Sequence, residues 1–289
     1  MTEKWIRHVE VRLPTRTFYG DEIDIEFSVE AGGQEAAAKA EVTIWNLGPA
    51  TRALFEKDTP IQVIAGYQDD YGGIFLGKID TVHQTRDGAD TGTVVTALDA
   101  LQELRDAQRI TILLPAGGRH VQAVREACRL AGIAPGTIED PGTTAEQEIT
   151  LYGTPAAVLQ EVANRVNGAL SRDDPDIGWR KPYQPLGPID PWITTIANNM
   201  LHFAPRSRPA GTAVLVSSAT GLQEIQPKTD EGGDSDYKVT TLLEHRIALD
   251  STIVIEGRTV AGNYRVVKLD HSGSSSGGDY TTSIEVKAL

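Results

Sequence analysis

Three groups of acidic residues are the first candidates for chemistry, because a glycosidase needs two carboxylates that face each other across a substrate cleft. The first group lies on the outward face of a predicted strand, and the other two lie beside glycine or proline, as residues of solvated turns do. Neither of the last two groups has the ligand series of an EF-hand calcium loop. We therefore predict no catalytic residue and no metal site among them. The groups are Glu22 with Asp24, Asp69 with Asp70, and Asp173 with Asp174 and Asp176.

Histidine and cysteine are the other side chains that could do chemistry, and their spacing favours structural roles. The histidines are scattered singly, with no serine or cysteine nearby in a Gly-Xaa-Ser-Xaa-Gly elbow. Cys128 lies on the apolar stripe of a predicted helix, where a buried thiol acts as a small hydrophobic side chain. Gly117-Gly118 precedes a helix but lacks the Lys and Ser/Thr of a phosphate-binding loop. We predict no nucleophile and no cofactor. The histidines considered are His83, His120, His202, His245 and His271.

The composition is that of a globular protein with a strongly negative charge. Of the 289 residues, 40% are hydrophobic and 23% are charged, and the formal net charge is −13. Because affinity for nucleic acid comes mainly from Lys and Arg, we expect no sequence-specific DNA-binding face. The charge is compatible with a surface that DNA passes without adhering.

The single cysteine excludes an intramolecular disulfide, which favours folding in the cytosol. Charged residues within the first twelve leave no apolar stretch for a signal peptide. No apolar run approaches the roughly 20 residues of a membrane span, so we expect no membrane segment.

Alternating apolar and polar residues predict a β-rich module over residues 1–114. The pattern is clearest at Ile25, Phe27 and Val29, and strands are also expected near residues 9–13, 40–45, 61–65, 74–76 and 93–98. Pro49 is suited to open a short helical turn, and residues 99–105 predict another. Gly77 indicates a bulge or a close approach of two backbones. The module is expected to be an antiparallel barrel or sandwich.

Helical spacing replaces this alternation over residues 115–175 and predicts a small α/β domain. Val121, Val124 and Cys128 share one helix face, and Gly132 stands where that helix should end. Thr154 can cap a second helix, which is expected to end at Asn167-Gly168. A strand is expected at residues 149–152, between the two helices.

Residues 176–204 are predicted to be an extended, proline-rich linker. Prolines recur at every third position, which is the spacing of a polyproline II turn. Aromatic residues lie among them, so the segment is expected to lie against a surface. The prolines are Pro182, Pro185, Pro188 and Pro191, and the aromatic residues are Trp179, Tyr183 and Trp192.

Residues 205–289 return to a strand pattern and are predicted to form a second β module. Strands are expected near residues 214–216, 239–243, 252–255, 264–269 and 283–286, with polar turns between them. The predicted fold class is therefore mainly β with a small α/β insert, in which two antiparallel β modules flank a two-helix domain.

Ordered motifs at both ends of the chain resemble those of phage tail hub proteins, which lie at the baseplate of phages and related contractile injection machines. The first β module resembles the opening domain of that family through Val42-Thr43-Ile44-Trp45-Asn46-Leu47, Ala65-Gly66-Tyr67 and Ile74-Phe75-Leu76-Gly77-Lys78-Ile79. The second resembles its terminal module through Thr220-Gly221-Leu222, Pro227, Thr241-Leu242-Leu243, Gly262-Asn263-Tyr264-Arg265-Val266-Val267, Asp270-His271-Ser272-Gly273, Asp279-Tyr280-Thr281-Thr282 and Ile284-Glu285.

The resemblance implies a homotrimer in which each subunit contributes two tail-tube-like β-barrels. Such a trimer presents a pseudo-sixfold ring that joins the sixfold tail tube to the threefold central spike and forms part of the DNA channel. The implied neighbours are a tail tube or distal tail protein, a spike or tail tip protein and a tape measure protein. The implied location is the baseplate of a virion tail, assembled in the host cytoplasm. The implied function is structural and not enzymatic.

Two other functions remain open at the level of the sequence. The acidic groups leave a cell-wall-degrading tail enzyme as an alternative, with Asp70 and Asp173 as the residues to test. Trp179, Tyr183 and Trp192 leave a carbohydrate-binding tail adaptor, in which aromatic rings would stack on sugars.

Overall fold

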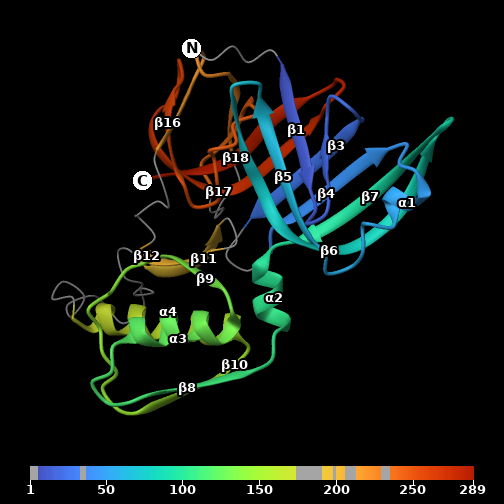
Figure 1. Cartoon of the computed structure of the whole chain (residues 1–289). Helices are drawn as coiled ribbons and strands as arrows, with labels where there is room; N and C mark the ends of the chain where they lie inside the picture. The colour runs from blue at the N-terminus through green and yellow to red at the C-terminus, as the bar shows by residue number, and fades with distance from the viewer. Residues whose placement is uncertain (1–5, 33–36, 174–190, 198–199, 206–212, 229–234) are drawn as a thin grey trace. The chain divides into compact units, whose positions relative to one another are not determined.

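The chain is mainly β, with 54% of the described residues in strands and 16% in helices. A computed structural model describes residues 6–32, 37–173, 191–197, 200–205, 213–228 and 235–289 (Figure 1). The chain divides into two compact units: residues 1–100 together with 211–289, and residues 101–210. The predicted domain boundaries at residues 114/115, 175/176 and 204/205 stay predictions.

The N-terminal part of the first unit is built from antiparallel strands, as their alternating sequence predicts. Ile25, Phe27 and Val29 are buried, while the intervening Glu26 and Glu30 are exposed. A helical turn begins at Pro49, as expected, and follows Gly48. The elements are β1 (Arg7–Arg12), β2 (Thr17–Tyr19), β3 (Ile25–Gly32), β4 (Lys39–Trp45), α1 (Pro49–Arg52), β5 (Pro60–Tyr67), β6 (Asp70–Asp87) and β7 (Asp90–Leu98).

The C-terminal part of the first unit is also a set of strands, and its β13–β16 pair is parallel. The five predicted strands are present. The sequence analysis missed a further strand, β14, because it is mostly exposed and its apolar residues Leu222 and Ile225 are three positions apart, which breaks the alternation of a strand. The elements are β13 (Val214–Ser217), β14 (Leu222–Pro227), β15 (Tyr237–Leu242), β16 (Thr252–Glu256), β17 (Ala261–Ser274) and β18 (Tyr280–Ala288).

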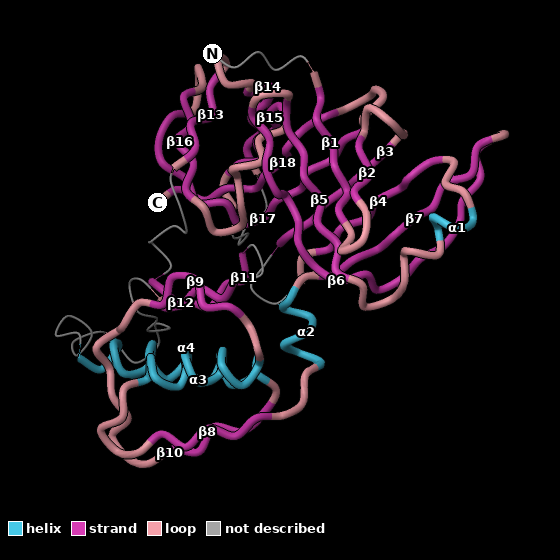
Figure 2. Tube along the Cα trace, viewed as in Figure 1, coloured by secondary structure: helices cyan, strands magenta, loops and turns pink. Residues whose placement is uncertain are grey.

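All of these strands belong to one 13-stranded sheet, whose two halves are joined by β3 and β17 (Figure 2). The two strands pair antiparallel, from Lys268 opposite Gly32 to Ser274 opposite Glu26. Each half has its own buried core: Val11, Ile44 and Val63 lie in the first, and Val239, Ile253 and Val286 in the second. Among the described residues the strand order has open ends, so no closed barrel is formed within one chain.

The second unit has two helices that pack against two small sheets. Helix α3 contacts β8 and β9, and α4 contacts β10 and β11 (Figure 1). Leu201 and Phe203 of β12 are fully buried in its core. The elements are α2 (Ala100–Asp106), which begins at the boundary between the units, β8 (Ile110–Leu114), α3 (His120–Ala131), β9 (Ala134–Ile138), β10 (Ile149–Gly153), α4 (Pro155–Asp173), β11 (Trp192–Ala197) and β12 (Met200–Pro205).

Both predicted helices are confirmed, but the predicted end of the second helix is wrong. Helix α3 ends at Gly132, which adopts the left-handed conformation with φ 70°. Helix α4 continues past Asn167-Gly168 to Asp173, because a single glycine lowers helix stability by only about 1 kcal/mol and packing offsets it. The Asn167 side chain bonds to the backbone of Trp192 instead of ending the helix.

The predicted linker is not an extended segment throughout. Its described residues 192–197 and 200–205 form an antiparallel pair, β11 with β12, and β12 also pairs in parallel with β9. This strand pair packs into the core of the second unit through the apolar side chains of Trp192, Leu201 and Phe203. Pro182, Pro185 and Pro188, with Trp179 and Tyr183, lie outside the described residues.

Candidate functional site

The feature that distinguishes the first unit is one antiparallel sheet that runs through both of its halves. Its strand order is β14-β15-β18-β17-β3-β4-β7-β6. In the described part of the chain no strand pairs with the outer edge of β14, and none pairs with the outer edge of β6 beyond Asp80. This eight-stranded sheet therefore ends in two open edges, and an open edge is a template for another strand.

The open part of β6 arises because this strand changes neighbours along its length. Residues 70–78 pair with β5, and residues 78–87 pair with β7. Gly77 lies at the change, where a side chain would overlap the carbonyl oxygen of Leu98 and the Phe75 ring. The close approach of backbones predicted at Gly77 is correct. A bulge there is not, because the two register shifts of β6 fall elsewhere: between Gly73 and Phe75 in the pairing with β5, and between Ile79 and Thr81 in the pairing with β7.

One face of the eight-stranded sheet is mostly polar, with Trp45, Val94, Leu98 and Leu242 as its apolar residues. Register and burial place hydroxyl, acidic and basic side chains on it, opposite the buried core. Carboxylates are more numerous on it than lysines. The carboxylates are Glu26, Glu30, Glu41, Asp87, Asp90, Glu224, Asp270 and Glu285, and the lysines are Lys39, Lys78, Lys228, Lys238, Lys268 and Lys287.

Asp270 marks the middle of this face, where the two halves join. It lies directly opposite Glu30 in the β17–β3 pair. Burial raises the pKa of the Asp270 carboxyl, and the Glu30 charge raises it further, while Lys268 and Lys238 act in the opposite direction. Where the strands of the two halves meet, Lys268 and Lys238 therefore partly offset the negative charge of the face.

Arg7 and Tyr280 tie the first strand to the C-terminal half. The Arg7 guanidinium donates hydrogen bonds to the carbonyl oxygens of Ser274, Gly277 and Gly278, at 2.7, 2.6 and 2.5 Å. Its Cζ lies 5.0 Å from the centroid of the Tyr280 ring. The Tyr280 hydroxyl accepts from Gly66 N at 3.0 Å and lies 2.8 Å from the carbonyl oxygen of His8. Burial raises the pKa of this hydroxyl, so it stays protonated.

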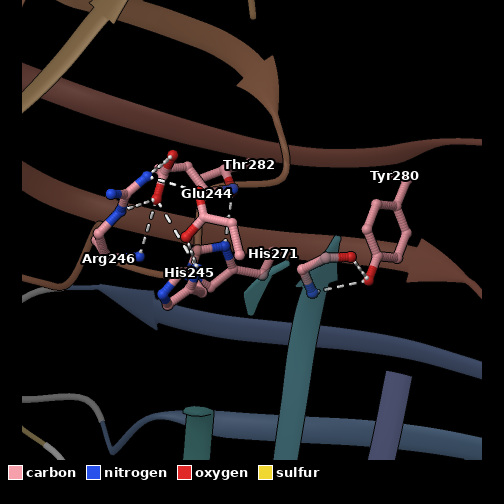
Figure 3. A network of polar contacts seen from close by, with 8 residues as sticks. Glu244, His245, Arg246, His271, Tyr280 and Thr282 are labelled. Atoms are coloured by element: carbon pink, nitrogen blue, oxygen red, sulfur yellow. Dashed lines mark hydrogen bonds and ion pairs between the residues drawn. The ribbon is translucent and has the colours of Figure 1, made fainter. Parts of the chain in front are cut away.

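A second polar network ties residues 244–246 to both halves of the sheet. Glu244 is buried, and its carboxylate accepts from Arg246 Nε at 2.6 Å and Nη2 at 3.0 Å. Arg246 Nη2 also donates to Asp70 Oδ2 at 2.9 Å. Behind this ion pair, Glu244 N donates to Thr282 Oγ1, which lies 2.8 Å from His271 Nδ1 (Figure 3). Strands β6, β17 and β18 are thereby held by one set of contacts.

Removing the Tyr280 hydroxyl should weaken the contact between the first strand and the C-terminal half. The variant Tyr280→Phe leaves the buried Gly66 N–H and the His8 carbonyl without their partner, so we expect a loss of about 2 kcal/mol in the free energy of unfolding. Urea unfolding measures it. As a matched control, Tyr71→Phe removes the hydroxyl of a 45% exposed ring and should change stability by less than about 0.5 kcal/mol. Equal effects of the two variants would contradict the assigned role.

Comparison with solved structures finds the same fold along nearly the whole chain. The 43 kDa tail protein of prophage MuSo2 from Shewanella oneidensis superposes with a TM-score of 0.65 and 8% sequence identity, over 97% of this chain and 98% of that one. A tail protein from Neisseria meningitidis MC58 gives 0.62 and 9%, over 98% and 97%. The chain has the fold of phage tail proteins.

A third structure with this tail-protein fold is the Escherichia coli c3393 protein. It is described as a component of the type VI secretion system with structural similarity to the T4 bacteriophage tail proteins gp27 and gp5. The TM-score is 0.60 and the identity 6%, over 96% of this chain and 76% of that one. No family model and no curated protein matches the sequence.

Within the part of the fold that the structure describes, the acidic groups do not gather into a pair across a cleft. Glu22 and Asp24 are exposed in the turn before β3, not on the strand as predicted. Asp69 lies in the β5–β6 turn, and Asp70 is ion-paired with Arg246. Asp173 is the last residue of α4, and Asp174 and Asp176 lie outside the described residues.

His245 lies near His271 in the network of residues 244–246, whereas His83, His120, His202 and Cys128 lie in other parts of the described fold. His83 is exposed on β6, His202 Nδ1 accepts from Thr137 N at 3.1 Å, and His120 Nδ1 lies 2.9 Å from Thr143 Oγ1. Cys128 is buried in the helix core as predicted, and burial raises the pKa of its thiol. No group of three or more His, Cys, Asp or Glu side chains in the described residues could hold a metal ion. Searched over the same residues, no helix is long and apolar enough to span a membrane.

Trp192 cannot serve as a sugar-stacking platform. Its ring is 8% exposed and packs against Phe203, with 5.1 Å between the ring centroids. The second unit does have an open cleft of about 440 Å³ between α4 and the loop before β10. His120, Glu146, Asn164 and Arg165 are among its lining residues, and no aromatic residue is.

The contacts that the sequence analysis missed are those between distant residues. Arg7 and Tyr280 lie at opposite ends of the chain, so neither indicates the other. His271 had a local signal: it shares the inward parity of Leu269 in β17, which predicts a buried side chain.

Proposed function

We propose that this chain is the structural hub of a phage or phage-like tail baseplate, a homotrimer that joins the sixfold tail tube to the threefold central spike. The observation that supports it most directly is the continuous sheet with open edges at β14 and at residues 81–87 of β6. The tail-protein fold over the whole chain supports the same proposal.

Closure by copies of the chain would remove both open edges at once. In the trimer, residues 81–87 of β6 pair with β14 of the next subunit, so that the sheet continues from one copy to the next. Such a heterologous contact generates a closed ring when the rotation between copies returns to the first subunit. An isolated open edge would otherwise invite uncontrolled association.

The two halves of the sheet account for the symmetry of the proposed joint. Each half has its own hydrophobic core, and β3 and β17 place them side by side in one sheet. In the proposal each half is a tail-tube-like module and the two become barrels with their neighbours in the ring. Three subunits then present six modules to a sixfold tube and three copies of every other surface to the spike.

The polar face of the sheet would line the channel of this ring. Its carboxylates repel phosphate and outnumber its lysines, and nonspecific affinity for nucleic acid comes mainly from Lys and Arg. DNA would then pass without adhering. The proposed neighbours are the tail tube or distal tail protein, the spike or tail tip protein and the tape measure protein, in a virion tail.

A non-enzymatic role agrees with the placement of the acidic residues. Asp70 is ion-paired with Arg246, which also bonds to Glu244, and this pairing disfavours a cell-wall-degrading enzyme that uses Asp70. The burial of Trp192 disfavours a carbohydrate-binding adaptor built on that ring.

The test is the mass of the full chain in solution, measured by light scattering with and without the co-expressed spike protein of the same tail. We expect a trimer. Proline at Val82 or at His83 tests the β6 edge separately from the stability of the fold. Neighbouring residues of a strand point their N–H groups to opposite sides, so one of Val82→Pro and His83→Pro removes only an N–H that faces outward. That variant should be monomeric by light scattering and folded by circular dichroism.

The same proline at the other position is the internal control, since it breaks the β6–β7 pairing and should lower stability. A chain that stays monomeric at every concentration, with and without the spike protein, would contradict the trimer. A trimer that persists in both proline variants would contradict the β6 edge as its contact.

A further inference from the structure

The strands β8 and β10 of the second unit form a separate two-stranded ribbon. They pair antiparallel, from Ile149 opposite Leu114 to Gly153 opposite Ile110. Their sequences, Ile-Thr-Ile-Leu-Leu and Ile-Thr-Leu-Tyr-Gly, contain no charged residue. That absence is notable in a chain of net charge −13, since charge on an edge strand is a common protection against added strands.

One face of this ribbon is buried and the other exposes large apolar side chains. Ile112 and Leu151 pack into the core of the second unit. On the opposite face, Leu113 is 60% exposed and Tyr152 is 65% exposed. Thr150 lies opposite Leu113 in the pairing, and Thr111 lies opposite Tyr152. The exposed face therefore presents an uncharged surface of the kind enriched in protein interfaces.

Both long edges of the ribbon are open as well. Among the described residues, β8 pairs only with β10 and β10 only with β8. Neither strand contains a proline, and no register shift interrupts their pairing. The ribbon thus lacks each of the usual devices that keep a third strand away: charge, proline and bulge.

The ends of the ribbon carry opposite charges. Arg109 precedes β8, and its guanidinium carbon lies 5.7 Å from the centroid of the Tyr152 ring. Glu148 precedes β10 at the other end of the ribbon and is exposed. A partner strand that fits this surface carries an acidic residue at the Arg109 end and a basic residue at the Glu148 end.

We infer that the β8–β10 ribbon is a docking site for an extended segment of another protein, which adds to it as a third strand. The segment alternates β-branched or aromatic residues with small polar ones, and the alternate side chains lie beside Leu113 or Tyr152. Main-chain hydrogen bonds supply affinity in this mode, and the side chains and terminal charges supply orientation. The site is separate from the open edges of the first unit and does not depend on the proposed trimer.

Two labelled peptides test the site on the full chain by fluorescence anisotropy. One is Lys-Thr-Val-Thr-Tyr-Thr-Val-Asp, and the other has its terminal Lys and Asp exchanged. We expect saturable binding with a preference for one order of charges, since an added strand runs in one direction. Hydrogen exchange should show new protection of amides in β8 or β10, because an added strand bonds to the ribbon backbone.

Variants identify the surface that binds. The double variant Leu113→Lys with Tyr152→Lys should weaken peptide binding by at least about tenfold, since it places charge on the ribbon. Leu130→Lys is the matched control, because Leu130 is also exposed, at 41%, but lies on α3. Circular dichroism checks that both variants fold.

Three results would overturn the inference: no binding of either peptide, equal binding of both, or binding that the double variant leaves unchanged. A fourth is self-association of the chain that the double variant abolishes, measured by sedimentation velocity. That result would assign the ribbon to a second copy of the chain instead of to another protein.

Discussion

The variant Gly77→Ala is expected to destabilise the first unit by about 3 kcal/mol, near the upper end of the cost of overpacking. A methyl group at this position would overlap the carbonyl oxygen of Leu98 and approach Phe75 Cζ to 2.7 Å. The Leu98 oxygen belongs to the backbone of β7, which is fixed by its pairing with β4 and β6. Relief of the overlap therefore requires movement of a strand.

The effect matters for assembly because Gly77 lies where β6 passes from β5 to β7. If the strands separate there, residues 81–87 no longer lie in line with the rest of the sheet. We expect urea unfolding to show the loss of stability, and light scattering to show a smaller fraction of trimer under the same conditions.

The control for Gly77 is Gly277→Ala, where an added methyl group meets nothing within 4 Å. It should change the free energy of unfolding by less than about 0.5 kcal/mol. A Gly77→Ala variant as stable as Gly277→Ala would show that the backbones of β6 and β7 are not held as closely as the structure has them.

The strands of the first unit were predictable where one face is buried and the other is exposed to solvent. In β3 and β4 the burial of Ile25, Val29 and Ile44 follows the alternation in the sequence. The pattern fails at residues 81–87 of β6, which are exposed on both faces and polar except for Val82. That failure coincides with the edge proposed to meet another subunit.

Local sequence patterns could not predict that the two halves of the sheet join. The β3–β17 pair connects residues that are more than 230 positions apart, as Gly32 and Lys268 are, and neither strand indicates the other. The same holds for the Arg7 contacts with Ser274 and Gly278. Ordered motifs at both ends indicated a shared architecture, but only the pairing placed them in one sheet.

His271 makes the stability of the first unit depend on pH, because its imidazole is fully buried at the junction of the two halves. Its Nδ1 lies 2.8 Å from Thr282 Oγ1, and the backbone of Ile247 also bonds to the ring. Burial is the main reason that its pKa is lowered from 6.5 to about 4; the nearby His245 acts in the same direction, and the Ile247 bond and Glu244 act in the opposite direction.

The free energy of unfolding should fall as the solution is acidified through this range. Above pH 6.5 the imidazole is neutral in the folded and the unfolded chain, so it makes no difference to stability. Between pH 6.5 and about 4 the unfolded chain binds a proton that the folded chain does not, and stability is lost. The loss attributable to His271 should reach about 3 kcal/mol by pH 4.

Urea unfolding of the native chain and of His271→Gln at several pH values isolates this group. The variant is expected to be less stable at pH 7, because its side chain fits the site less well, but to lose less stability on acidification. His120, which is also buried with a lowered pKa, contributes in the same direction in both proteins and cancels in the comparison. His83→Gln, at an exposed position, should leave the pH dependence unchanged. Parallel pH profiles for the native chain and His271→Gln would mean that the imidazole accepts a proton in the folded protein, and that the two halves of the sheet open around it.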